Sequence, residues 1–234
     1  MNGRRFLARA ASVIALALPS ALPAPVTAQG AVRGTVALLE RAGSSARDLA
    51  NAVVYLDIPG RVINDTRESH ASAEIDMRHR EFEPHVQIVR AGGAVSFPNS
   101  DPFSHNVFSN TAYGAFDLGL YRSGVRRGYA FARPGVYAIY CNIHARMVSF
   151  VVAVTTPYVA RVATDGSFSI PAVPPGTYRL HAWHERTPEH VQELVVSAAG
   201  IASIRLTLDA RGYVAKPHPN KFGAPYAMTR ADRY

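Results

Sequence analysis

The residues of this chain best suited to chemistry gather in one short run, from Tyr140 to Met147. Within this run Cys141 is followed by His144 and then by Met147, each three positions after the last. A thiolate and a thioether are soft ligands that suit Cu(I), and an imidazole binds copper in both common oxidation states. The run therefore predicts part of a copper site.

A second histidine would complete the ligand set. One cysteine and two histidines in a trigonal arrangement, with a weak axial methionine, resist the square-planar geometry that Cu(II) prefers. His105 is the natural candidate, because it follows the predicted strand at 94–97 and can approach from the other sheet. If all four positions come from protein, no position stays open for substrate, so we expect one-electron transfer and no enzymatic activity.

Residues 70–154 resemble the cupredoxin family of small blue copper proteins, with a ligand spacing similar to that of amicyanin. The resemblance rests on a glycine-turn hairpin at 92–93, on Asn99 before a His-Asn-Val run, and on a Cys-x-x-His-x-x-Met run. It implies one type 1 copper ion, with Asn106 steadying the ligand loop. The ligands that it implies are His105, Cys141, His144 and Met147.

The ligand loop departs from amicyanin at Ala145 and Arg146, where that protein has Pro and Phe. Three other interpretations of the same residues stay open. Cys141 could be a buried structural thiol, or a hydrolase nucleophile with His144 as its base. Zinc is also a chemically reasonable occupant, although a methionine ligand argues against it.

The first 28 residues predict a secretory signal peptide that is cleaved after Ala28. Three arginines near the start precede an apolar stretch at about 10–22 and the small residues Val26–Ala28. The alternative is a membrane anchor, but the apolar run is shorter than the roughly 20 residues of a span. We therefore expect a periplasmic or secreted protein with no membrane span after cleavage. In such an oxidising compartment the single cysteine, Cys141, needs burial or a metal to protect it.

The formal net charge of +8 at first suggests an anionic partner, such as nucleic acid, a lipid surface or an acidic protein. Without residues 1–28 the chain keeps 22 basic and 17 acidic residues, a net charge of +5. Of this charge, +4 belongs to residues 211–234 and only +1 to residues 29–210. We therefore expect no nucleic-acid partner. Arg146 and the basic tail favour an acidic redox partner.

The patterning from Ala31 onward predicts an all-β chain. Short runs rich in Val, Ile, Tyr and Phe alternate with Gly, Pro, Asn and Asp, and no long run has the period of about 3.6 residues expected of an amphipathic helix. The resemblance implies that 70–154 form a Greek-key cupredoxin sandwich. Within it we expect a hairpin at 92–93, a loop-rich stretch at 98–123, and one shared strand face for Tyr137, Ile139 and Cys141.

A second, smaller β-sandwich is expected around the first. The Asp165-Gly166 turn and the Pro174-Pro175-Gly176 run resemble the carboxypeptidase regulatory-like, or prealbumin-like, sandwich. We predict that residues 31–60 and 157–209 form this sandwich, with the copper domain inserted between them. A polar linker at 61–72 and a flexible basic tail at 211–234 complete the predicted organisation.

The segment Leu180–Glu185, with its Trp-His-Glu run, is similar to one in periplasmic proteins of the methylamine-utilisation or plastocyanin-like type. His184 and Glu185 are adjacent and should point to opposite faces of a strand, which is poor ligand geometry. We favour a structural or interface role over a second metal or docking site. Four other histidines, His70, His79, His85 and His190, are expected at the surface.

The leading hypothesis is an exported type 1 copper protein that transfers single electrons. The alternative is a copper-binding adaptor whose accessory sandwich docks a partner protein or a carbohydrate. A third, enzymatic reading needs an open copper position, and only a weak or absent bond to Met147 would support it.

Overall fold

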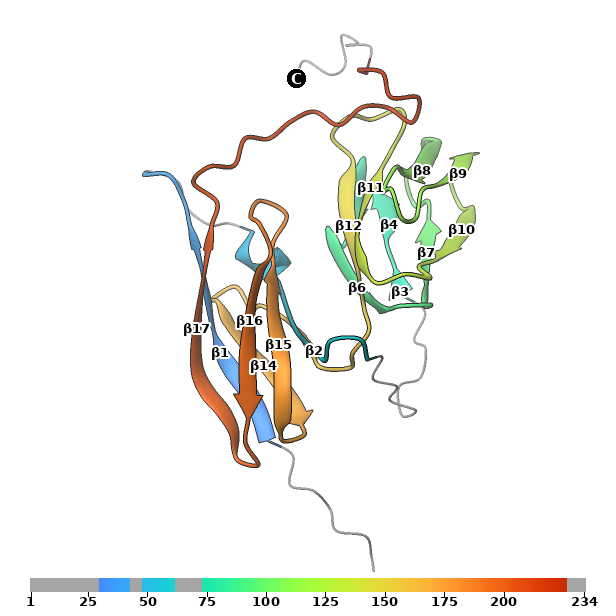
Figure 1. The fold of residues 1–234 in the computed structure, drawn as a ribbon. Coiled ribbons are helices and arrows are strands. Elements are labelled where there is room, and N and C mark those ends of the chain that lie inside the picture. The colour runs from blue at the N-terminus through green and yellow to red at the C-terminus, as the bar shows by residue number, and fades with distance from the viewer. Residues whose placement is uncertain (1–29, 43–47, 62–72, 227–234) are drawn as a thin grey trace, which may run out of the picture.

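The computed structural model describes residues 30–42, 48–61 and 73–226. Nearly all of its regular elements are β-strands, and they form two β-sandwiches (Figure 1). The prediction of an all-β fold with two sandwiches is confirmed. The predicted signal peptide and most of the predicted linker at 61–72 lie outside the described residues. Over the described ranges, no helix has the length and apolar character needed to cross a bilayer.

One sandwich, called here the central sandwich, contains the strands between Ala73 and Val154. Its larger sheet has the order β6 (Val86–Arg90), β12 (Val148–Val154), β11 (Gly135–Tyr140), β8 (His105–Ser109) and β9 (Phe116–Tyr121). Its smaller sheet has the order β10 (Arg126–Ala130), β7 (Ala94–Pro98) and β3 (Ala73–Glu74). A hairpin of β4 (Asp76–Arg78) and β5 (Glu81–Glu83) lies beside them.

Alternation along β11 supplies part of the core of the central sandwich. Tyr137, Ile139 and Cys141 are at most 1% exposed and belong to one apolar cluster, as expected for residues two apart on a strand. The prediction that they share a face is therefore confirmed. Cys141, the residue directly after β11, is therefore part of this core, and the loop that carries His144 and Met147 begins from it.

The other sandwich, called here the terminal sandwich, joins strands from both ends of the chain. One sheet has the order β14 (Ser167–Val173), β1 (Gly30–Leu39) and β17 (Gly200–Asp209). The second has the order β13 (Val159–Arg161), β2 (Val53–Asp57), β15 (Gly176–Trp183) and β16 (His190–Val196), and a short 3-10 helix at Leu49–Asn51 precedes β2. Strand β2 pairs with β13 and β15, and β1 with β14 and β17, so the central sandwich lies between these partners in sequence.

The two sandwiches contact each other through an apolar interface. Strand β12 is apolar almost throughout because both of its faces are buried: one packs in the central core, and the other faces the terminal sandwich. The buried residues of this interface are Val53, Val86, Val152, Val154 and Trp183. The Trp183 ring lies 5.4 Å from that of Phe150, centroid to centroid.

An ion pair also crosses between the sandwiches. His85 Nε2 lies 2.8 Å from Glu185 Oε1, and the His85 ring meets Phe150 edge-on at 5.6 Å. His85 was expected at the surface; its side chain is 34% exposed, but it is paired with Glu185 and packed against Phe150.

Two predicted turns, at Gly92 and at Gly166, connect strands that belong to different sheets. Strand β6 pairs with β12 whereas β7 pairs with β10 and β3, so the turn at Gly92 carries the chain from one sheet to the other. Gly92 has a φ of 90°, a conformation that glycine adopts at low cost. Gly166 likewise separates β13 from β14, which belong to different sheets. The turn residues were read correctly, but local sequence does not specify which strand each one pairs with.

The stretch at 98–123, expected to be loop-rich, also contains two strands. Strand β8 is buried at every position, and β9 pairs with it. These two strands were not predicted, because β8 carries His, Asn and Ser, polar residues whose partners are supplied by tertiary contacts and not by the strand pattern.

The predicted flexible tail is also corrected over its described part. Residues 211–226 contain no strand or helix, but several of them hydrogen-bond or stack on the central sandwich. The prediction treated the lack of periodicity as flexibility, whereas polar and ring contacts to another part of the chain hold this segment.

Candidate metal centre

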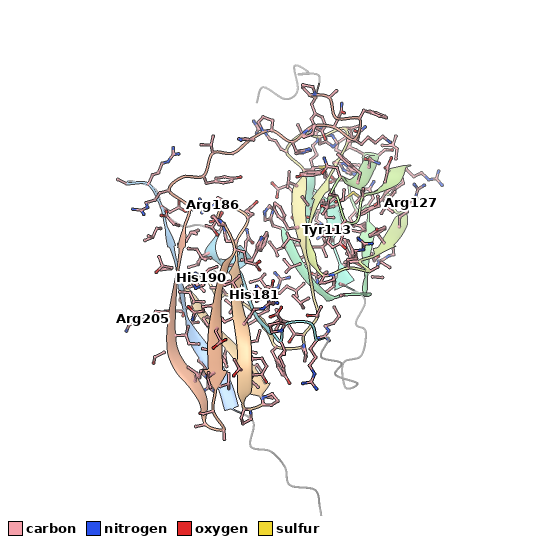
Figure 2. All side chains as sticks on the ribbon, in the orientation of Figure 1. Tyr113, Arg127, His181, Arg186, His190 and Arg205 are labelled. Atoms are coloured by element: carbon pink, nitrogen blue, oxygen red, sulfur yellow. The ribbon has the colours of Figure 1, made fainter. Side chains whose placement is uncertain are left out.

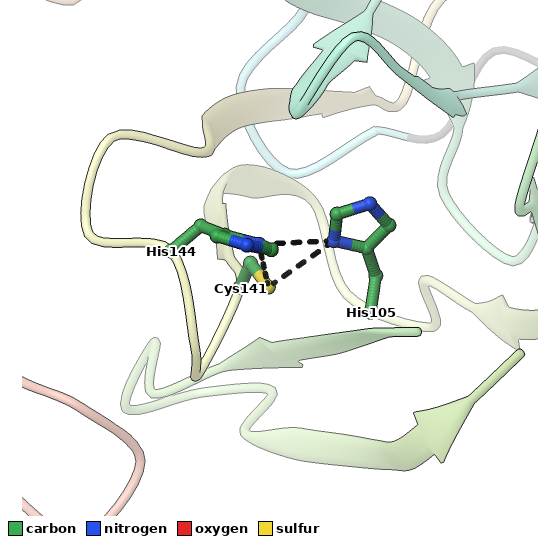
Figure 3. A group of neighbouring side chains, drawn as sticks. All are labelled: His105, Cys141 and His144. Carbon is green, nitrogen blue, oxygen red and sulfur yellow. Dashed lines mark hydrogen bonds between the residues drawn. The ribbon is translucent and has the colours of Figure 1, made fainter. Parts of the chain in front are cut away.

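Three of the four predicted ligands lie together at one end of the central sandwich (Figure 3). The Nδ1 atoms of His105 and His144 are 3.1 Å apart. Cys141 Sγ is 3.7 Å from His144 Nδ1 and 3.9 Å from His105 Nδ1. His105 and Cys141 are fully buried, while His144 is partly exposed. The site is thus an interior triangle with one corner near solvent.

Strand pairing explains how residues 36 positions apart meet. Strand β8 runs antiparallel to β11, with Phe108 opposite Tyr140. His105 begins β8, and Cys141 directly follows β11, so both side chains reach the same end of the sheet. His105 had been expected on a loop of the opposite sheet; the structure places it on a strand of the sheet that also holds β11.

The loop after β11 is closed by its own backbone. The Met147 N–H donates to the carbonyl of His144 at 3.0 Å, and the Cys141 N–H donates to the carbonyl of Met147 at 3.2 Å. Met147 is fully buried in the same apolar cluster as Cys141. These bonds fix the Cys-x-x-His-x-x-Met run as a compact loop between β11 and β12.

Asn106, predicted to steady the ligand loop, contributes through its backbone. Its N–H hydrogen-bonds the sulfur of Cys141. Its side-chain Nδ2 donates to Asp117 Oδ1 at 2.7 Å, while its Oδ1 has no hydrogen-bond partner among the described residues. The side chain thus ties β8 to β9, and the backbone touches the cysteine.

Burial and hydrogen bonding act in opposite directions on the cysteine. Removal from water raises the pKa of the Cys141 thiol, and backbone hydrogen bonds from Asn106, Ile143 and His144 partly offset this effect. A nucleophilic cysteine needs solvent access and a lowered pKa, and Cys141 has neither. A bound cation would instead favour the thiolate, and the N–H groups aimed at the sulfur suit that charged form.

Asp101 is a site residue that the sequence reasoning missed. His105 Nε2 lies 2.7 Å from Asp101 Oδ2, so the carboxylate takes the outer ring nitrogen and leaves Nδ1 directed at the triangle. A carboxylate behind a ligating histidine fixes its tautomer and orientation. The only signal in the sequence is a carboxylate four positions before His105, which by itself is unremarkable.

The Asp101 carboxylate is itself held by a tight turn. The N–H groups of His79 and Arg80 donate to its two oxygens at 2.7 and 2.8 Å. Both turn residues have positive φ, 55° and 59°, which is uncommon outside glycine and directs both N–H groups to one side. Although burial acts to raise the pKa of Asp101, these bonds and the one to His105 lower it. His79 was expected merely at the surface; its backbone supports the site.

The ligand triangle fits a single metal ion. An ion bound to histidine nitrogen and cysteine sulfur at roughly 2.0–2.3 Å would separate coplanar ligand atoms by about 3.5–3.8 Å. The observed separations of 3.1, 3.7 and 3.9 Å are close to these values. Within the described residues, this is the one group of His, Cys, Asp or Glu side chains with ligand atoms gathered closely enough for a metal.

Comparisons with known proteins give limited likenesses. The family described as polysaccharide lyase family 4, domain II, matches residues 147–202, from β12 into the terminal sandwich. A search of curated proteins returned no match.

Three solved structures illustrate the structural matches. A purple cupredoxin from Nitrosopumilus maritimus is 24% identical, with a TM-score of 0.33; the match covers 36% of this chain and 100% of the cupredoxin. A mutant amicyanin in its reduced Cu(I) form is 20% identical over 38% of this chain and 87% of its own, with a TM-score of 0.34. A copper-containing nitrite reductase from Thermus scotoductus is 24% identical over 36% of this chain and only 22% of its own, also at 0.34. TM-scores at this level are too low to establish a shared fold.

Two histidines of the terminal sandwich, which the sequence favoured for a structural or interface role, make contacts within the protein. His184 is fully buried, with Nε2 donating to the Asp48 carbonyl at 3.2 Å and Nδ1 accepting from the Arg186 N–H at 3.3 Å. His181, which Figure 2 places on the terminal sandwich, stacks on Tyr55 at 4.4 Å. Both rings therefore have structural contacts, as favoured from the sequence.

Proposed function

We propose that the chain is an exported copper protein that transfers single electrons. His105, Cys141 and His144 would hold one type 1 copper ion, and Met147 would be the fourth ligand. The observation that carries the proposal is the buried Nδ1–Nδ1–Sγ triangle, whose soft thiolate and paired imidazoles suit copper. When bound, copper supplies a one-electron change between its two oxidation states.

Residues around the site would hold the ligand side chains in the same positions in both oxidation states of the copper. Asp101 fixes the His105 ring from behind, and the short backbone bonds of the loop fix His144 and Met147. Burial of His105 and Cys141 excludes water from the ligand triangle. A site that does not rearrange favours fast electron transfer, because little geometry has to change with each electron.

A partner would approach at the exposed corner of the site. His144 is partly exposed, and the neighbouring Ile143 is 47% exposed and Arg146 exposed. An apolar side chain beside a cation suits a redox partner with an acidic rim. In the described part of the tail Arg211 pairs with Asp209 and Lys221 with Asp117, which leaves Lys216 and Arg146 as candidates for steering a partner. Arg146 is the better one, because it lies two positions after the ligand His144.

Zinc and hydrolytic chemistry fit the chain less well. A structural zinc site takes four strong ligands, usually Cys or His, and the fourth donor expected here is the thioether of Met147. Hydrolysis would need an accessible nucleophile, and the Cys141 thiol is fully buried. We therefore propose no enzymatic activity for this site.

One observation favours a second candidate, a copper-binding adaptor. The matching family, described as a domain of polysaccharide lyases, spans residues 147–202, which contain β12, all of β13 to β16 and the start of β17. In this alternative the terminal sandwich docks a partner protein or a carbohydrate, and the copper has a secondary role. The carboxypeptidase regulatory-like resemblance of the same strands also belongs to this proposal.

Voltammetry of the copper-loaded protein separates the two candidates. An electron carrier should give a reversible one-electron wave, with copper retained through repeated cycles. An adaptor should lose copper on reduction, or co-sediment with an insoluble polysaccharide whether or not copper is bound. The wave should disappear in Cys141→Ser and persist in Ser149→Ala, which changes a buried hydroxyl on β12 outside the ligand set.

A further inference from the structure

The segment after β17 crosses from the terminal sandwich to the metal end of the central sandwich. Strand β17 ends at Asp209, and the chain then continues without regular structure to the loop that follows β11 (Figure 1). Its first residues stay with the terminal sandwich, where Arg41 Nε donates to the carbonyl of Arg211 at 2.7 Å. The segment is therefore held on the terminal sandwich before it reaches the ligand loop.

Direct contacts join the far part of this segment to the ligand loop. The Tyr226 hydroxyl donates to the backbone carbonyl of Cys141 at 2.6 Å. The Lys221 N–H donates to Asn142 Oδ1 at 2.9 Å. The His218 ring stacks on Tyr140 at 4.0 Å between centroids and 22° between planes. The segment thus touches three successive residues, 140–142, around the thiolate ligand.

The same segment reaches the strand that carries the other buried ligand. Lys221 Nζ lies 2.7 Å from Asp117 Oδ2, and Asp117 Oδ1 accepts the side chain of Asn106 at 2.7 Å. Asn106 follows His105 and donates its backbone N–H to the cysteine sulfur. Lys221 therefore contacts the loop after β11 with its backbone and the β8–β9 pair with its ammonium group.

An internal turn gives the segment its shape. The Gly223 N–H donates to the Asn220 carbonyl at 2.9 Å, and the Asn220 N–H donates to the Ala224 carbonyl at 2.8 Å. Asn220 Oδ1 accepts from the N–H groups of Phe222 and Ala224 at 2.9 and 3.1 Å. Because these bonds close the turn on itself, the Lys221 N–H stays directed at Asn142.

We propose that residues 218–226 act as a strap that positions the thiolate ligand, with Tyr226 and Lys221 as positioning residues. The predicted slowing of metal loss rests on the copper site proposed above, whereas the predicted protection of the Cys141 thiol does not. The strap holds the carbonyl of Cys141 and the side chain of Asn142, so it limits movement of the loop. It should slow both the exposure of the thiol and the loss of bound metal.

Alkylation of the metal-free protein tests the effect on the cysteine. Iodoacetamide can modify only one cysteine, Cys141, and its rate reports how often the loop opens. Tyr226→Phe removes one neutral hydrogen bond, so the alkylation rate should rise roughly fivefold to tenfold. Tyr213→Phe makes the same chemical change near the start of the segment and should leave the rate at the wild-type value.

Lys221→Gln tests the second contact, with Lys216→Gln as its matched control on an exposed residue of the same segment. Loss of the Asp117 pair should also raise the alkylation rate, by a smaller factor than Tyr226→Phe, because this ion pair is partly solvent-exposed. Far-UV circular dichroism should be unchanged in all four variants, since none of these residues lies in a strand.

Copper release to a chelator completes the test. If Tyr226→Phe matches Tyr213→Phe in alkylation and in release, while the wild type binds copper, the strap proposal is overturned and the copper proposal stands. If Tyr226→Phe alkylates faster but the wild type takes up no copper, the strap holds the cysteine and the proposed function fails. Faster alkylation together with faster copper release and an altered visible spectrum supports both.

Discussion

At the residue scale, Asp101 decides how His105 presents its inner nitrogen. The carboxylate accepts the N–H groups of His79 and Arg80 and hydrogen-bonds the His105 ring at 2.7 Å. It therefore links the turn at His79 and Arg80 to the outer nitrogen of the His105 ring, whereas the inner nitrogen, Nδ1, belongs to the ligand triangle. A histidine held in this way keeps the same ring nitrogen available to the metal.

Asp101→Asn should weaken copper binding by about 10- to 100-fold, because the amide no longer supplies a charged acceptor to the His105 ring. Competition with a chelator of known affinity measures this change. Asp165→Asn, at an exposed turn of the terminal sandwich, is the control and should bind copper as the wild type does. An unchanged affinity in Asp101→Asn would show that packing alone orients His105.

The ligand types were predictable from the sequence, but their support was not. Cys141 and His144 belong to one short run, and His105 was chosen because the set needed a second imidazole. Asp101 lies in a loop with no periodic pattern, and its partners come from a turn more than 20 positions earlier. Positive φ at His79 and Arg80 is a result of tertiary packing that residue types do not encode.

At the element scale, β8 shows why a buried strand can be read as a loop. Its His, Asn and Ser residues are polar, yet every position is buried because Asp101, Asp117 and Thr111 supply their hydrogen-bond partners. The loop that leads into β8 depends on Asn99. This residue donates to the carbonyls of Phe103 and Tyr121 at 2.8 and 3.1 Å and accepts the Asp101 N–H.

Asn99→Ala should lower the free energy of unfolding by about 2–4 kcal/mol, since it removes three hydrogen bonds and withdraws the Asn99 donor from two carbonyls, although the Asp101 N–H keeps its bond to the Met77 carbonyl at 3.1 Å. Urea denaturation of the metal-free protein measures the change. Asn110→Ala, at an exposed position just after β8, should cost less than about 0.5 kcal/mol. Equal stability of the two variants would contradict the role given to Asn99.

Strand positions were more predictable than strand partners. The runs that became β1, β2, β6, β7, β11 and β12 are apolar and bounded by turn residues, so local sequence marks them. The crossings at Gly92 and Gly166 look like hairpin turns locally, and only the packing of two sheets assigns the strands on either side to different partners.

At the scale of the whole molecule, the two sandwiches are joined by an apolar interface and an ion pair. Trp183 is the only tryptophan of the chain and lies in this interface, 8% exposed. Trp183→Ala should lower the free energy of unfolding by about 3–5 kcal/mol, the usual range for emptying a large buried aromatic site. Urea denaturation followed by circular dichroism measures the loss.

Val195→Ala on the outer strand β16 is the control for this interface and should have little effect, because Val195 is 67% exposed. A loss of under about 1 kcal/mol in Trp183→Ala would mean that the sandwiches do not depend on this contact.

The ion pair across the interface should make stability depend on pH. Burial acts to lower the pKa of His85, but Glu185 outweighs this effect and raises it. A histidine with a raised folded-state pKa contributes its full stabilisation below its ordinary pKa of about 6.5, and this is lost as the pH rises through the folded value. His85→Gln should therefore lower the melting temperature more at about pH 6 than at about pH 9.

Glu185→Gln is the matched variant for His85, because it removes the carboxylate and keeps the side-chain length. It should show the same trend with pH. A melting-temperature difference from the wild type that is equal at both pH values, in either variant, would contradict a charged pair between the sandwiches.

The central claim is that Cys141 and two histidines bind copper as one buried centre, and the visible spectrum of the copper-loaded protein tests it most directly. Wild-type protein should take up one Cu(II) per chain and gain an intense thiolate-to-copper absorption band, which gives a blue or green colour. Cys141→Ser should lose the band. A wild-type sample that stays colourless after aerobic loading, or that is equally coloured with and without Cys141, would contradict the claim.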